Sequence, residues 1–215
     1  MPLALLLASV AVFASPATPR QLATQEAPFR PFAQDVVTEV NRRLALPPDD
    51  RPPAALALLL AIQVHCAIHR GDSAAALAAA EKIRALQPTP DQQAYAGVTT
   101  QALVAADEPA RHDRGSPAYV ARFQREFAHQ LAELPATAAM RRVLEDQRDK
   151  TRAMTADGLL QDLVTKVPPR AAGEGYTLEE ADQIIRAHHK LADILPLKKA
   201  MLAGLDAAIA ARPSD

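Results

Sequence analysis

The chain has 215 residues, of which 49% are hydrophobic and 23% charged, and its formal net charge is −1 at pH 7. A near-neutral chain lacks the basic field that a phosphate backbone selects, which argues against nucleic acid as a partner. Because Cys66 is the only cysteine, an intramolecular disulfide is excluded and packing must supply the stability.

Residues 1–14 are apolar or small from the third position onward. Val12 and Ala14 supply the small-residue pair that signal peptidase accepts, and Ser15 follows. This pattern predicts a signal peptide over 1–14 and export to the periplasm or the extracellular space. The run is shorter than the about 20 apolar residues that cross a bilayer, so no stable membrane span is expected after cleavage. An N-terminal core helix or a retained anchor is the alternative.

The rest of the chain shows helical periodicity and no convincing strand alternation. Hydroxyl residues stand where they would cap helix starts, and prolines and glycines mark the ends. These signals predict helices over about 28–46, 54–70, 73–87, 91–107, 117–134, 136–154, 157–166, 178–193 and 197–211. The predicted fold is all-α, with antiparallel helical hairpins stacked as a short solenoid or an irregular helical bundle.

The stretch Leu58–Pro88 combines an apolar helix, a Gly71-Asp72 break and a second helix with regularly spaced alanines. This arrangement predicts a helical hairpin. Cys66 lies among apolar residues of the first helix, without a cationic or helix-terminal setting that would activate a thiol. A small buried hydrophobe is therefore its expected role, and a reactive thiol is the alternative.

The second helix of the hairpin places small and apolar residues at a regular spacing, with Gly71-Asp72, Ala76, Ala80, Ile83 and Pro88. This spacing resembles the second helix of a tetratricopeptide repeat and its closing proline, and the resemblance covers about one repeat. It implies a concave groove in which such repeats bind peptides. The residues that would face this groove are Leu58, Ala61, His65, Ile68 and His69.

The family's best-known peptide clamp uses basic and amide side chains, which Ala61 and His65 do not provide. The resemblance therefore favours apolar or pH-sensitive recognition over capture of a carboxylate terminus.

His65 and His69 also share one helix face, where two imidazoles would reach one zinc or copper ion. A structural zinc site needs four ligands, and Cys66 stands where helical metalloproteases carry glutamate. We therefore predict no metal site and no cofactor, and keep metal binding at this pair as an alternative. His188 falls on an apolar helical stripe, which predicts a buried histidine with satisfied hydrogen bonds.

The charged segment 108–116 predicts a linker between an N-terminal, repeat-like lobe at 15–107 and a C-terminal helical lobe at 117–215. Within the second lobe, the segment 136–154 is crowded with charges of both signs and offers few apolar residues to a core. Such a composition is typical of a solvated outer helix.

A second resemblance rests on three groups of residues in the C-terminal lobe, Leu159-Leu160-Gln161, Thr177–Ala181 with Ile184-Ile185, and Ile194-Leu195-Pro196-Leu197-Lys198. They are similar to helical N-terminal regions that precede the catalytic domain in some secreted bacterial subtilisin-like peptidases. None of the peptidase's Asp, His or Ser motifs occurs in these residues. The resemblance thus implies an accessory or prodomain-like module without activity.

No set of residues combines a nucleophile, a base and the spacing of a known mechanism, so no catalytic residue is predicted. We expect a non-catalytic exported scaffold that binds a protein or peptide. The alternatives are the peptidase accessory module and a metal-binding protein that uses His65 and His69. Alanine-rich helical layers can end in an exposed apolar face, which leaves a homo-oligomer open.

Overall fold

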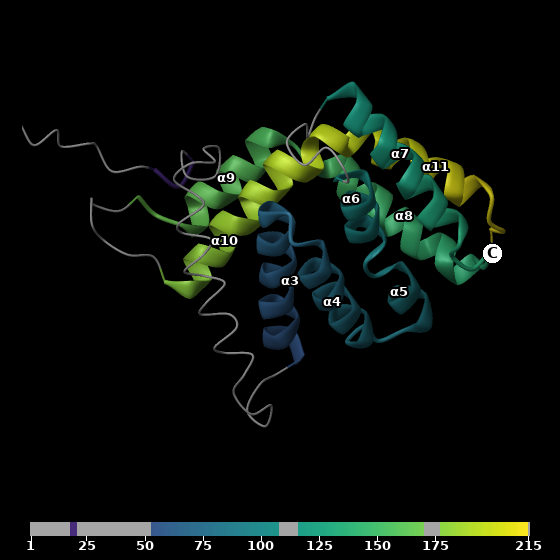
Figure 1. Cartoon of the computed structure of the whole chain (residues 1–215), viewed down its shortest axis with the longest axis horizontal. Helices are drawn as coiled ribbons and strands as arrows, with labels where there is room; N and C mark the ends of the chain where they lie inside the picture. Colours follow the sequence, from purple (N-terminus) through teal and green to yellow (C-terminus); the bar gives the residue numbers. More distant parts are fainter. Residues whose placement is uncertain (1–17, 21–52, 108–115, 170–176, 215) are drawn as a thin grey trace, which may run out of the picture.

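The computed structural model describes residues 18–20, 53–107, 116–169 and 177–214, and all regular elements in these ranges are helical (Figure 1). The all-α prediction is therefore confirmed, while the stacking of hairpins as a solenoid stays a prediction. The predicted signal peptide at 1–14 and the predicted helix at 28–46 lie outside the described residues. Within the described ranges, none of the helices combines the length and the apolar character needed to cross a bilayer.

The α-helices are α3 (Pro53–Arg70), α4 (Ser73–Ala85), α5 (Pro90–Tyr95), α6 (Val98–Asp107), α7 (Pro117–Ala132), α8 (Ala138–Ala153), α9 (Ala156–Lys166), α10 (Leu178–His189) and α11 (Lys198–Ala210). A π-helical turn, η2 (Lys190–Ile194), and a 3-10 turn, η3 (Leu195–Leu197), join α10 to α11. The hydroxyl caps expected from the sequence are present, because Thr89, Ser116 and Thr177 each accept a hydrogen bond from a main-chain N–H of the first turn.

Two helices differ from the sequence prediction. The segment 91–107 is divided into α5 and α6 at Gly97, whose φ of +90° suits a residue without a Cβ. The segment 178–193 is α-helical only to His189, after which the chain continues as the wider π-turn. The first difference affects Tyr95 and Thr100, which line the candidate site, and the second places Asp193 beside His189.

One buried cluster runs from Val64 on α3 to Ile209 on α11, and so crosses the predicted linker at 108–116. In it α4 packs on α3, α7 packs on α6, and α11 lies against both α7 and α8 (Figure 1). The rings of Phe123 and Phe127 stack at 5.3 Å between centroids at the centre of this cluster. The division into two lobes stays a prediction, since residues from both sides of the linker share this core.

Arg212 joins the end of α11 to the end of α7. Its side chain is nearly buried and donates to four main-chain carbonyls, those of Pro135 at 2.9 Å, Ala208 at 2.6 Å, and Leu131 and Leu134 at 2.9 Å each. Carbonyls at a helix C-terminus have no partner within the helix, so the guanidinium satisfies acceptors that the fold would otherwise leave unpaired.

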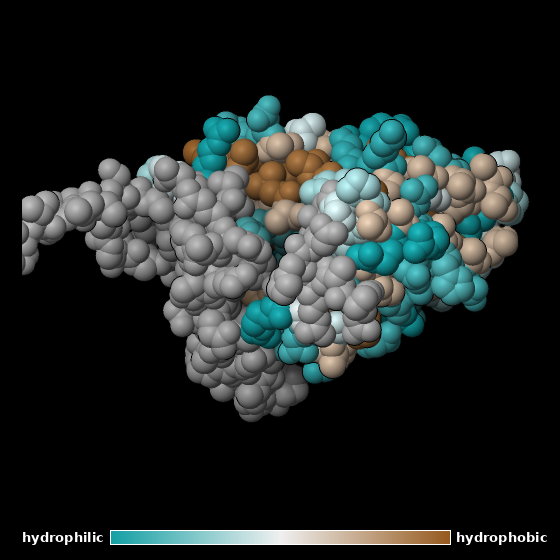
Figure 2. Space-filling model, turned by 45° about the horizontal axis from the view of Figure 1, so that its top comes forward, coloured by the Kyte–Doolittle hydropathy of each residue, from teal (hydrophilic) through white to brown (hydrophobic). Residues whose placement is uncertain are grey.

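The surface in Figure 2 carries a group of apolar side chains at the end of the molecule where α9 and α10 lie, with hydrophilic residues around it. Among the described residues, the one large apolar side chain that counts as exposed is Val164, at 39%. Single exposed residues of this kind are ordinary. A homo-oligomer therefore stays an alternative from the sequence.

Candidate functional site

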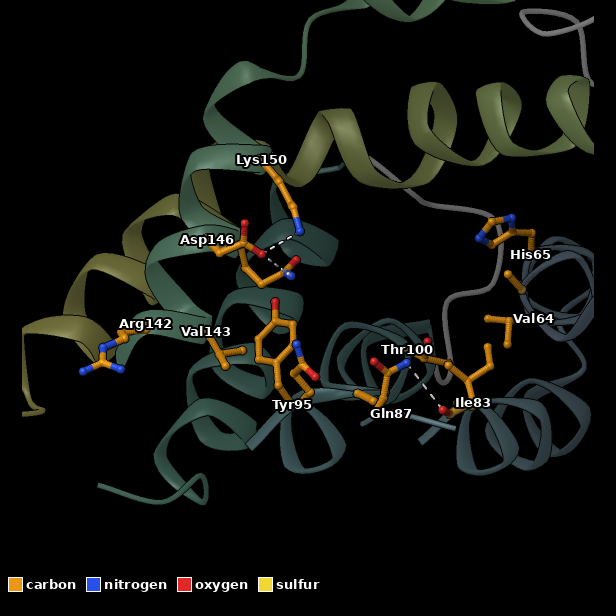
Figure 3. Close-up of a pocket in the computed structure, with 16 residues that line it drawn as sticks. Val64, His65, Ile83, Gln87, Tyr95, Thr100, Arg142, Val143, Asp146 and Lys150 are labelled. Carbon is orange, nitrogen blue, oxygen red and sulfur yellow. Dashed lines mark hydrogen bonds and ion pairs between the residues drawn. The ribbon is translucent and has the colours of Figure 1, made fainter. Parts of the chain in front are cut away.

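A cleft of about 590 Å³ opens between the α3/α4 hairpin and α8, with α5 and the start of α6 between them (Figure 3). Its apolar lining consists of Ala61, Val64, Ala80, Ile83, Ala96 and Val143. Its polar lining consists of His65, Gln87, Gln92, Tyr95, Thr100, Arg142, Asp146, Gln147 and Lys150. Concave sites of this size with a mixed lining are the usual places for small ligands and peptide segments to bind.

One face of α8 forms the charged wall of the cleft. Positions three or four apart on a helix share a face, which brings Arg142, Asp146 and Lys150 to the same side. Lys150 Nζ lies 2.6 Å from Asp146 Oδ2, and Gln147 Nε2 donates to the same oxygen at 3.4 Å. The composition of 136–154 predicts a solvated outer helix, and these three side chains are indeed exposed to solvent where they border the cleft.

Tyr95 stands at the end of α5 beside Val143 in the cleft (Figure 3). Burial raises the pKa of Tyr95 to about 12, the hydrogen bond with Thr99 lowers it, and the carboxylate of Asp146 raises it. The phenol therefore stays protonated at neutral pH. It offers the cleft one hydroxyl group and one apolar ring face.

His65 forms the opposite wall and links α3 to α10. Its ring stacks on that of His189, with centroids 4.3 Å apart and planes inclined by 16°. His189 Nδ1 donates in turn to Asp193 Oδ2 at 2.9 Å, within the π-turn. The hydrogen bond sets the position of the His189 ring, and the stack sets that of His65.

The imidazole of His65 is neutral at pH 7. Burial holds the pKa of His65 well below its ordinary value of 6.5, and the neighbouring His189 and Arg186 lower it further. Asp193 acts in the opposite direction, and Lys190 again lowers the pKa. The Nδ1 atom of His65 is buried and has no hydrogen-bond partner.

The structure brings only part of the predicted groove to this cleft. Ala61 and His65 line it, whereas Ile68 is buried in the core and lines a separate space of about 10 Å³ beside Leu103. Ile68 therefore does not line the cleft that Ala61 and His65 line, and the groove expected from the resemblance stays a prediction. Ala61 and Ile68 are seven positions apart and lie on nearly the same face of α3, but Ile68 is two turns further along, where it borders a small space with Leu103 and Val104 of α6. The side chains of Leu58 and His69 lie outside the described residues.

Metal binding gains no support from the described side chains, among which no three His, Cys, Asp or Glu residues are grouped to hold an ion. The partner that folding brings to His65 is His189, and the two rings stack face to face.

His188 is buried, at 3% exposure, as its place on the apolar stripe predicts.

Cys66 is fully buried in α3. Burial raises the pKa of the Cys66 thiol to about 12, Arg70 lowers it, and Asp182 raises it. A thiol that stays protonated is a poor nucleophile, so the structure agrees with the role of a small buried hydrophobe.

Sequence reasoning missed the groups that complete the cleft. The amides come from Gln87 after α4, Gln92 in α5 and Gln147 in α8, and nothing local in the sequence marks these residues as neighbours. One usable signal was Gly97, whose interruption of the 91–107 pattern turns Tyr95 and Thr100 toward a common space.

Comparison with known proteins finds no matching family model, no matching curated protein and no matching solved structure. The resemblances to a tetratricopeptide repeat and to peptidase accessory regions therefore stay predictions from the sequence. The cleft itself is the basis for any statement about function.

Proposed function

We propose that this protein is a non-catalytic, exported helical scaffold that binds a polypeptide segment in the cleft between the α3/α4 hairpin and α8. The observation that carries the proposal is the composition of the cleft. Apolar side chains from Ala61, Ile83 and Val143 lie there beside neutral polar groups and the charged face of α8, and the volume is about 590 Å³. The apolar run at 1–14 supports export.

The neutral polar groups suit a peptide main chain. Each peptide unit carries one donor and one acceptor, and the side chains of Gln87, Gln92 and Gln147 also carry both. Apolar residues of the bound segment would contact the apolar lining, as in other grooves that accept peptides.

Selection from a random dodecapeptide library, with the purified full chain as bait, tests this proposal. Synthetic copies of the selected peptides should bind saturably in calorimetry. Ala61→Trp, which places an indole in the cleft, should weaken binding at least about tenfold because filled space excludes the ligand.

The matched control is Ala78→Trp, the same substitution at an exposed position of α4 that does not line the cleft. Circular dichroism of both variants separates a blocked site from a lost fold. Equal binding by both folded variants would remove the cleft from the proposal.

A further inference from the structure

His65 is the group in the cleft whose bonding is incomplete. Its Nδ1 is buried without a hydrogen-bond partner, while the side chain as a whole lines the cleft. An unpartnered buried polar atom destabilises a fold, so its presence in a packed wall calls for an explanation.

The protonation state of the His65 ring decides which nitrogen can donate a hydrogen bond to a ligand. Burial and the positive charges of Arg186 and Lys190 keep the pKa of His65 low, so the ring is neutral and carries one N–H. Orphaned buried N–H groups are rarer in native structures than under-satisfied acceptors. We therefore assign the hydrogen to Nε2 and take the unpartnered Nδ1 as the nitrogen without hydrogen.

The ring holds this donor in a fixed direction. Figure 3 shows the imidazole of His65 turned from α3 toward the space that faces α8. One face of the ring is covered by His189, which Asp193 holds through a 2.9 Å hydrogen bond. Because π-stacking and the bond to Asp193 restrain the pair, a ligand meets a donor that needs little reorganisation.

We propose that His65 fixes the register of the bound peptide by donating a hydrogen bond from Nε2 to an sp² oxygen of that peptide. This inference rests on the proposed function and deepens it. The oxygen belongs either to a main-chain carbonyl or to a side-chain carboxylate, both of which accept from an imidazole N–H.

Two substitutions distinguish the ring nitrogens. A glutamine side chain reaches the position of Nε2 with an amide N–H, whereas an asparagine side chain reaches only the position of Nδ1. For a peptide that binds the wild-type chain, His65→Gln should bind within about threefold of wild type. His65→Asn and the nearly isosteric His65→Phe should each lose about tenfold, the usual effect of leaving a buried acceptor unpaired.

The peptide itself identifies the acceptor. If the acceptor is a carboxylate, replacing one acidic residue of the peptide with alanine abolishes the difference between wild type and His65→Phe. If it is a main-chain carbonyl, no side-chain replacement does so, and a thioamide at one peptide bond does. These comparisons are double-mutant cycles, which isolate the pairwise interaction.

Circular dichroism and thermal unfolding establish that each variant is folded. Wild-type affinity in folded His65→Phe would overturn the inference, and so would strong binding by His65→Asn with weak binding by His65→Gln. If peptides bind and Ala61→Trp blocks them while all His65 variants bind equally, the inference fails and the proposed function survives. If no peptide binds the wild-type chain, both are wrong.

Discussion

Arg212 and His65 are two nitrogen-bearing side chains that lie at junctions between helices, and their hydrogen bonding differs. The guanidinium of Arg212 donates to four main-chain carbonyls at the ends of α7 and α11. The imidazole of His65 has one buried nitrogen without a partner, in a side chain that lines the cleft. A buried polar group that makes all its hydrogen bonds stabilises the native fold. A buried polar group that lacks one of them lowers the stability of the fold.

The largest expected effect is the loss of stability when Arg212 is replaced. Arg212→Met should lower the free energy of unfolding by about 3 kcal/mol, because carbonyls of Leu131 and Leu134 lose their donor inside the protein. Urea unfolding followed by circular dichroism measures the change. Arg152→Met is the control, because that side chain is 60% exposed and its surface ion pair should matter by less than about 0.5 kcal/mol. Equal losses of unfolding free energy in Arg212→Met and Arg152→Met would show that the buried hydrogen bonds of Arg212 add no more stability than a surface ion pair.

Replacing His65 should change the free energy of unfolding in the opposite direction. His65→Phe removes a buried nitrogen that has no partner and retains a ring that can stack on His189. We expect the free energy of unfolding to rise by about 1 kcal/mol while peptide affinity falls, as is common when a functional group is replaced by an apolar one. His129→Phe, at an exposed position of α7, controls for the substitution itself. A clear loss of stability in His65→Phe would show that the ring is held for structural reasons.

The smallest effect is a difference in pH dependence. Below pH 6.5 His65 takes up a proton in the unfolded chain, while burial, His189, Arg186 and Lys190 keep the folded ring neutral against the pull of Asp193. The unfolded state then binds more protons, so stability present above pH 6.5 is lost as the pH falls. Between pH 6.5 and 5.5 this loss is at most about 1 kcal/mol.

Urea unfolding of wild type and His65→Phe at pH 7.5, 6.5 and 5.5 checks this sign. The stability of the variant should fall less than that of wild type. If the free energies of unfolding of wild type and His65→Phe change in parallel with pH, His65 titrates alike in the folded and unfolded states and is not held neutral by the fold.

The sequence predicted the helices because their signals are local. A hydroxyl cap such as Ser116 or Thr177 and a break such as Gly71-Asp72 act within a few residues, and the structure has helix boundaries next to each. The division at Gly97 was missed, since the apolar spacing of 91–107 continues across it.

The site was less predictable than the helices. Periodicity shows which face of α3 carries His65, but it does not say that α8 lies opposite or that His189 stacks on the ring. Those pairings depend on how helices far apart in the chain pack, and their side chains carry no shared local pattern. The wider turn at Lys190–Ile194, which places Asp193 beside His189, leaves no recognisable signature either.

Tyr95 gives the cleft an optical property of its own. The chain contains three tyrosines and no tryptophan. Tyr119 is enclosed in the core at 2% exposure, and Tyr176 lies outside the described residues. Part of the ultraviolet emission of the unlabelled protein therefore originates from a ring on the cleft wall. A ligand that displaces water from this ring alters that emission, so occupancy becomes measurable without a dye, a tag or an engineered residue.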